Sequence, residues 1–181
     1  DIHVEEAGAC EAKTGAGAVF LDTANGDVEV STGTGGIRVG AARGAVSIKN
    51  ANGDTWVGEA TGEVRVHAAN GNIAVDRALA GITARTANGS VAFGEVRRGT
   101  VVAQTACGSI DVGVLEGVAA WLDLDTKFGH VNNGLDAARP QPGEDTVEVR
   151  AGTAFGDINV RRSRRPAATA SSTNGTGKDE A

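Results

Sequence analysis

The sequence is poor in the residues that fill an ordinary globular core. Its 181 residues include no tyrosine and no methionine, and aromatic residues make up 3%. Only 3 prolines stand against 27 glycines, and the glycines do not recur at every third position, which excludes a collagen-like chain. Because a thin core of stacked valine and isoleucine needs few large side chains, this composition favours a repeat protein.

Other absences narrow the classes of function. No run of 18 apolar residues is present, so no membrane-spanning helix is expected. The net charge of -6 argues against nucleic acid as a partner, because phosphate binding needs a basic face. The chain begins at Asp1, without methionine and inside the repeat pattern, so we expect an upstream segment in the natural protein.

A repeat of about nine residues organises the chain. One class of turn glycine recurs at a period near 18, and a second class falls between its members. The first class comprises Gly17, Gly35, Gly53, Gly71, Gly89, Gly108, Gly129 and Gly156. An apolar residue follows two and four positions after nearly every one of these glycines, as at Ile73 and Val75. Such alternation is typical of a strand with one buried face.

The repeat predicts an all-β fold, a right-handed parallel β-solenoid of about eight coils of roughly 18 residues with two strands per coil. A three-sided β-helix is the alternative. We expect the solenoid to occupy residues 1–162, with insertions at 119–121 and 135–144. The last coil is expected over 146–160, closed by Arg161, Arg162 and the arginines that follow. Residues 163–181 have almost no apolar bulk, so we expect a disordered tail.

The corners of the coils carry two polar columns. Asn-Gly pairs recur there, as at Asn52 and Asn70, and both residues of such a pair tolerate positive φ. A second column of mostly threonine lies three residues before each first-class glycine. We expect these hydroxyls to bond to one another along the stack.

Several phrases together resemble one known family. They are TANGDVEV, KNANGDTWVGE, HAANGNIAVDRA, RTANGSVAFGEV, GVAAWLDLDTKFGHV and FGDINVRRS. They are similar to a bacterial, actinobacterial-type β-strand-repeat family of unknown function that carries an adhesin label, and the likeness covers about residues 1–163. The resemblance implies a β-solenoid and brings no catalytic residues, and its adhesin label is an analogy between repeat folds.

The sequence gives little sign of catalytic or metal chemistry. His3, His67 and His130 form no nucleophilic constellation with other residues, so we expect no cofactor and no enzymatic activity. The residue after each first-class glycine is mostly not acidic, which argues against calcium in the corners. Cys10 and Cys107 lie five coils apart, about 24 Å by the strand spacing, so we expect free thiols. Free thiols favour a cytoplasmic location, with the cell surface as the alternative.

The candidate contact surface is an outward column that contains Phe20, Arg38 and Trp56 on successive coils. Exposed aromatic clusters mark contact sites, although an upstream segment or a loop could also cover them. The leading hypothesis is a non-enzymatic interaction module for a protein or a surface glycan. The second is a scaffold that self-associates through its N-terminal coil, and the third is a polysaccharide-acting enzyme. Such an enzyme would need a pair of carboxylates, which the outward columns lack.

Overall fold

The fold was taken from a computed structural model, which describes residues 1–135 and 145–163. These residues form two parallel β-sheets and contain no helix. The nine-stranded sheet consists of β1 (Ile2–Ala7), β3 (Val19–Ala24), β5 (Ile37–Ala42), β7 (Thr55–Ala60), β9 (Ile73–Ala78), β11 (Val91–Val96), β13 (Ile110–Leu115), β15 (Val131–Asn133) and β17 (Ile158–Ser163). The eight-stranded sheet consists of β2 (Cys10–Ala16), β4 (Val28–Thr34), β6 (Val46–Asn52), β8 (Val64–Asn70), β10 (Ile82–Asn88), β12 (Gly99–Cys107), β14 (Ala119–Phe128) and β16 (Thr146–Phe155).

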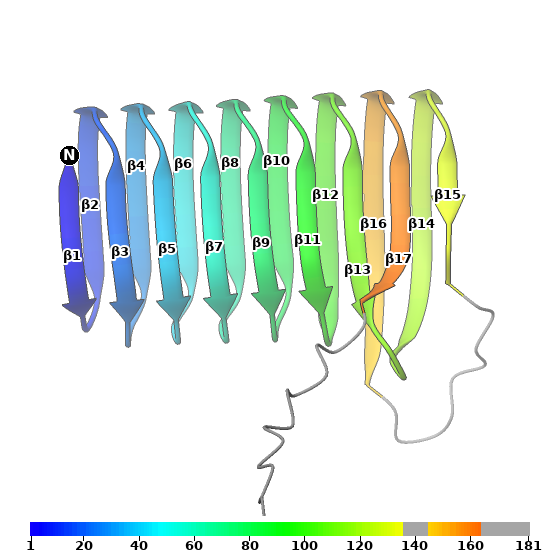
Figure 1. Cartoon of the computed structure of the whole chain (residues 1–181), viewed down its shortest axis with the longest axis horizontal. Helices are drawn as coiled ribbons and strands as arrows, with labels where there is room; N and C mark the ends of the chain where they lie inside the picture. The colour runs from blue at the N-terminus through cyan, green and yellow to red at the C-terminus, as the bar shows by residue number, and fades with distance from the viewer. Residues whose placement is uncertain (136–144, 164–181) are drawn as a thin grey trace, which may run out of the picture.

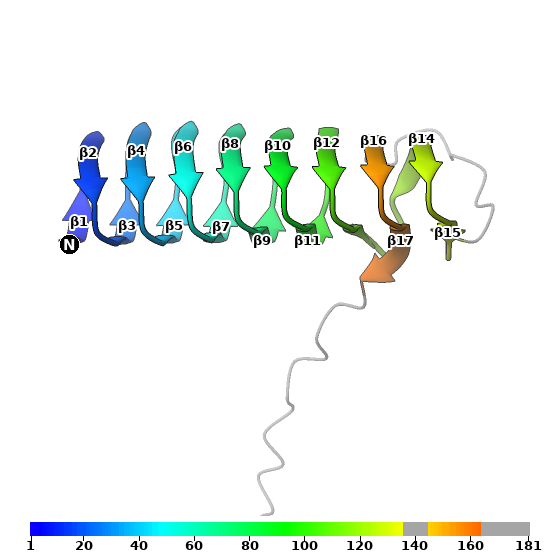
Figure 2. The ribbon, with the colours of Figure 1, turned by 90° about the horizontal axis from the view of Figure 1, so that it is seen from above.

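The two sheets lie face to face, and the chain alternates between them (Figure 1). Each odd-numbered strand up to β13 runs down the sheet nearer the viewer, and the even-numbered strand after it returns on the far sheet. This path advances steadily along the long axis, which makes the coil right-handed (Figures 1 and 2). The prediction of a two-strand parallel solenoid is confirmed, and the two-sheet arrangement excludes the three-sided alternative.

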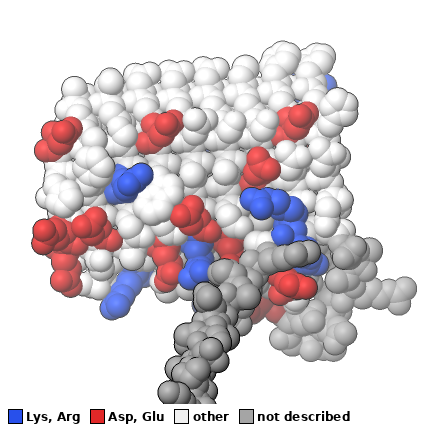
Figure 3. All heavy atoms as spheres, in the orientation of Figure 1, with Lys and Arg blue, Asp and Glu red and all other residues white. Residues whose placement is uncertain are grey.

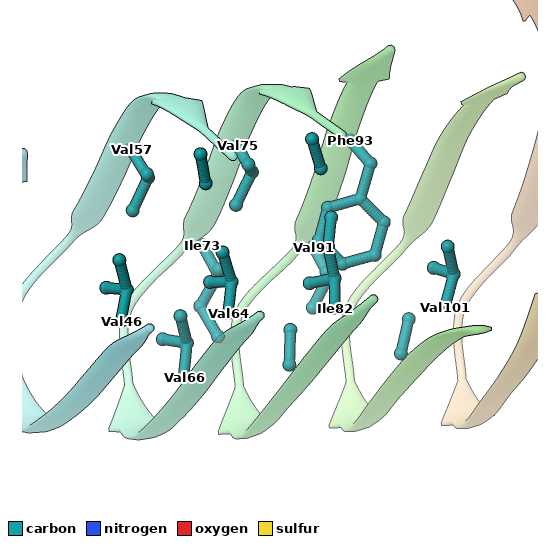
Figure 4. Packing of buried hydrophobic residues seen from close by; sticks show 14 of the residues in the cluster. Val46, Val57, Val64, Val66, Ile73, Val75, Ile82, Val91, Phe93 and Val101 are labelled. Carbon is teal, nitrogen blue, oxygen red and sulfur yellow. The ribbon is translucent and has the colours of Figure 1, made fainter. Parts of the chain in front are cut away.

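The core lies between the sheets and consists mainly of valine and isoleucine. Val57, Val75 and Phe93 point inward from the nine-stranded sheet, toward Val66 and its neighbours on the other sheet (Figure 4). Val66 and Val75 are 0% and 1% exposed, as the repeat predicts. Phe93 is the one aromatic side chain buried in the part of the chain that the structure describes. Each coil therefore buries its apolar face against its neighbours, as in other solenoids.

The corners differ from the prediction in two details. First-class glycines such as Gly53 and Gly89 have φ of 136° and 148°, whereas no described residue other than glycine has positive φ, the corner asparagines included. The threonine hydroxyls do not bond to one another. Thr14 donates to the Ala16 carbonyl, and the other threonines of the column donate to glycine carbonyls. Thr105 Oγ1, for example, donates to the Gly89 carbonyl at 2.9 Å. The threonine column thus ties most corners to the adjacent coil.

The largest correction concerns the order of the final coils. We call each strand position along a sheet a rung. The nine-stranded sheet ends in the order β13-β17-β15, and the eight-stranded sheet ends in the order β12-β16-β14. The coil of β16 and β17, the last along the chain, therefore lies between the preceding coils and the coil of β14 and β15 (Figures 1 and 2). The expectation that it closes the stack is wrong.

The inward residues explain this order. Ile158 and Val160 on β17 are buried at 0% and 2% exposure, and they suit an interior rung. On β15 the equivalent positions are Val131 and Asn133, and both are exposed. An asparagine between two coils would lose its water, at a cost of about 2 kcal/mol or more if no partner replaced it. The coil with the polar residue therefore occupies the outermost rung.

The turn after β13 must step past one rung, and Arg162 supports it. Arg162 Nη1 donates to the carbonyls of Val118 at 2.7 Å and Leu115 at 3.2 Å. The sequence suggested that Arg162 is a charge that closes the end of the stack. The structure shows instead that its side chain binds main-chain carbonyls of the turn. The expected insertion at 119–121 is also wrong, because these residues begin β14. The expected loop at 135–144 and tail at 163–181 lie outside the described residues, apart from Leu135 and Ser163. Ser163 is the last residue of β17 and not the start of a tail.

Candidate functional site

The predicted contact residues lie together on the outer face of the nine-stranded sheet. Phe20 pairs with Arg38 and Arg38 pairs with Trp56 on the adjacent strands β3, β5 and β7. His3 on β1 extends the row, with its ring centroid 6.1 Å from that of Phe20. Phe20 is 36% exposed and Arg38 is exposed, whereas Trp56 is half-buried. The parallel register of the rungs therefore converts a repeat in the sequence into a continuous row on the surface.

Arg38 and Trp56 make the closest contact in this row. The guanidinium carbon of Arg38 lies 5.2 Å from the centroid of the Trp56 ring, within the range of a cation–π interaction. The indole also extends along its own strand over Gly58, where a Cβ atom would lie 2.9 Å from Trp56 Cη2. Glycine at position 58 therefore leaves room for the ring against the sheet.

The row changes character beyond Trp56. Trp56 pairs with Ala74, Ala74 with Ala92, and Ala92 with Asp111, on β7, β9, β11 and β13. The two alanines leave two rungs without a large side chain between the indole and the Asp111 carboxylate. Trp56 and Asp111 are three strand spacings apart, which is about 14 Å between their backbones. We call the stretch over Ala74 and Ala92 the alanine slot. It was not predicted from the sequence, although its residues lie in the same outward column as Trp56.

An ion-pair row runs beside the slot. Arg77 Nη1 lies 3.2 Å from Glu59 Oε2, and Arg77 Nε lies 4.0 Å from Glu95 Oε1. These residues line two open depressions of about 480 and 560 Å³ on this face. The carboxylate of Asp76, exposed in the same region, has no ion-pair partner among the described residues. Figure 3 shows this face, with acidic side chains scattered over it.

The other candidates from the sequence do not converge. Cys10 and Cys107 are free, on strands β2 and β12 of the same sheet. His130 lies 3.5 Å from Asp157, and the side chains of both are exposed. No group of three or more His, Cys, Asp or Glu side chains within the described ranges could hold a metal ion. A hydrogen bond from Lys13 lowers the pKa of the exposed Glu11 and raises the pKa of Lys13, which marks a surface pair on the other sheet.

Several exposed apolar side chains lie on β14, β15 and β16, at the end of the stack, and were not predicted from the sequence. Trp121, Phe128 and Phe155 are 67%, 65% and 55% exposed, and Val131 is 43% exposed. The rings of Phe128 and Phe155 stack with centroids 5.0 Å apart. They continue the corner column of Asn52 and its successors, so the column itself was the available signal.

These features define the chain as a parallel β-solenoid with one aromatic and charged face. The comparisons with protein families, with curated proteins and with solved structures found no match. No helix long and apolar enough to cross a membrane is present in residues 1–135 and 145–163.

Proposed function

We propose that this protein is a non-enzymatic interaction module, and that the row of Phe20, Arg38 and Trp56 is its contact surface for a protein or a surface glycan. The observation that carries the proposal is the contact between Arg38 and Trp56 at 5.2 Å on an exposed sheet face. Two aromatic side chains with a cation between them offer apolar area and hydrogen-bond donors on a rigid support. The likeness to the adhesin-labelled repeat family favours the same kind of function by analogy.

The test compares the wild-type chain with Trp56→Leu and Arg38→Ala on arrays of glycans and of peptides. We expect at least one class of ligand to be retained by the wild type and lost by both variants. Trp121→Leu is the matched control, since Trp121 lies at the far end of the stack and on the other sheet. A hydrolysis assay on the retained ligands separates a binder from an enzyme. Ligands that bind the Trp56 variant as well as the wild type would refute the proposed surface.

A second candidate function is a self-associating scaffold. The outer edges of β1, β2, β14 and β15 have no strand partner among the described residues, and such edges can pair with another chain. The sequence suggested association through the N-terminal coil, where Cys10 and Ala12 are small inward residues. The exposed apolar side chains Trp121, Phe128 and Val131 favour association through the opposite end, at β14 and β15. Light scattering at several concentrations tests this candidate, and a Trp121→Ser, Phe128→Ser variant should reduce any association.

A further inference from the structure

The nine-stranded sheet carries more negative charge than the opposite sheet. The strands of this sheet hold seven carboxylates and four arginines. These residues are Glu5, Glu6, Asp22, Glu59, Asp76, Glu95, Asp111, Arg38, Arg77, Arg161 and Arg162. The eight-stranded sheet is close to neutral, with five carboxylates and six lysines or arginines over its strands. The acidic excess therefore belongs to the sheet that carries Trp56. Figure 3 shows acidic side chains spread over this face.

Three of these four arginines are already engaged. Arg77 lies between Glu59 and Glu95, and Arg38 lies against the Trp56 ring. Arg162 donates to main-chain carbonyls, whereas Arg161 lines the depression that also contains Asp76. Asp76 and Asp111, which flank the alanine slot, have no salt-bridge partner in the part of the chain that the structure describes. The slot therefore combines an aromatic ring at one end, small apolar side chains along its floor and two carboxylates at its rim.

We propose that the alanine slot binds a lysine or arginine side chain from a cationic segment of a partner polypeptide. The inference deepens the proposed function and rests on it, since it names the partner of the same face. The aliphatic stem would lie over Ala74 and Ala92, as long cationic side chains cover apolar surface elsewhere in proteins. The charged group would lie at the Trp56 end of the slot, against the ring and the Asp76 carboxylate, and a neighbouring cationic residue of the segment would reach Asp111.

Two features favour a cationic polypeptide over a neutral ligand. Arg38 already places a guanidinium beside the Trp56 ring, so the ring accepts this group from within the chain itself. Arg161 shares a depression with Asp76, yet the carboxylates of this sheet outnumber its arginines by seven to four, and a basic partner would balance that excess by charge complementarity. A neutral glycan could stack on the Trp56 ring, but it would form no ion pair with the carboxylates of Asp76 and Asp111.

The test follows the fluorescence of Trp56 in a Trp121→Phe background, which leaves one tryptophan in the chain. The probe is a hexaarginine peptide, with a glycine-serine peptide of equal length as its control, at low ionic strength. We expect a saturable change in emission with hexaarginine alone. The variant Asp76→Asn, Asp111→Asn should weaken this binding roughly tenfold, as expected for the loss of two exposed ion pairs.

A matched variant separates this site from general attraction to an acidic protein. Glu29→Gln, Asp125→Asn removes the same charge from the eight-stranded sheet and should change the affinity less than about twofold. Equal weakening by the two double variants would overturn the proposal, and so would the absence of any response to hexaarginine. If hexaarginine fails while a neutral glycan binds the wild type and not Trp56→Leu, the proposed function stands and this inference falls. If neither binds, both fall.

Discussion

Asn133 and Val160 are paired neighbours on β15 and β17, at the same inward position of adjacent rungs, and Val160 alone is buried. This pair explains why the last coil along the chain lies inside the stack. An interior coil is covered by a neighbouring coil on both sides, so it needs an apolar side chain at this inward position. β15 carries Asn133 there instead. The outermost rung has water on one side, where an asparagine keeps its hydrogen bonds.

Exchange of these two residue types tests that explanation. Val160→Asn should lower the free energy of unfolding by about 2–4 kcal/mol, because it places an amide inside the core. Asn133→Val should change it by less than about 1 kcal/mol, because the site is exposed. Urea unfolding of the two variants measures both effects. Strong stabilisation by Asn133→Val with a mild effect of Val160→Asn would instead place β15 inside the stack.

The assigned core columns predict a sharp contrast between neighbouring residues. Val66→Asp should abolish cooperative folding, because it buries an unpaired charge at a cost of several kcal/mol. Arg65→Asp should be nearly silent, since Arg65 is exposed and its ion pair with Glu63 at 3.0 Å lies on the surface. Thermal unfolding followed by circular dichroism distinguishes the two. A Val66→Asp variant as stable as the parent would contradict the register.

The columns could be predicted from the sequence because a solenoid repeats one local pattern. Turn glycines and alternating apolar residues fixed the strands, and Val66 and Val75 are buried as expected. The rung order could not be read in this way, since every coil satisfies the same pattern and pairing between coils is not local. Asn133, a polar residue in a core column, was the available signal for the outermost coil.

Asn50 is a position in the corner column where a substitution should stabilise the protein. It replaces the usual threonine, and its Nδ2 atom donates to the carbonyls of Gly35 at 3.1 Å and Gly53 at 2.8 Å. Its buried Oδ1 atom has no partner. Asn50→Thr should keep the bond to Gly35, as Thr32 bonds to Gly17, and remove the orphan oxygen. We expect an increase of about 1 kcal/mol in the free energy of unfolding by urea.

The reverse change at Thr86 is the control for this prediction. Thr86 Oγ1 donates to the Gly71 carbonyl at 3.3 Å in the same column. Thr86→Asn should therefore lower the free energy of unfolding, because it adds a buried amide oxygen. If Asn50→Thr destabilises the protein as much as Thr86→Asn does, the Gly53 bond outweighs the orphan oxygen.

Calcium should have no effect on stability. The corner positions carry residues of mixed type, and three or more acidic, histidine or cysteine ligands do not gather anywhere in residues 1–135 and 145–163. Circular dichroism melts with calcium and with a chelator should therefore overlay. A shift of more than a few degrees would show that the corners hold oxygen ligands that we have not recognised.

The contact surface was partly predictable for the same reason as the core. Phe20, Arg38 and Trp56 occupy one outward column, so their proximity followed from the period. The room that Gly58 gives the indole depends on how the side chain turns along its strand. The alanine slot depends on which carboxylates remain unpaired. Neither is visible in a one-dimensional pattern, because side-chain direction and ion pairing are set by the folded sheet.

The position of the coil of β16 and β17 is the central claim about this fold, and a disulfide test addresses it most directly. Gln104 pairs with Gly152 and Gly152 pairs with Asp125, so Gln104 and Asp125 lie two rungs apart on the outer face. In a Cys10→Ala, Cys107→Ser background, Gln104→Cys with Gly152→Cys should form a disulfide under mild oxidation. Gln104→Cys with Asp125→Cys should not, because two rungs span about 9.6 Å and a disulfide needs Cα atoms within about 7 Å. Crosslinking of the second pair and not the first would show that the coils follow the order of the sequence and would contradict the intercalated arrangement.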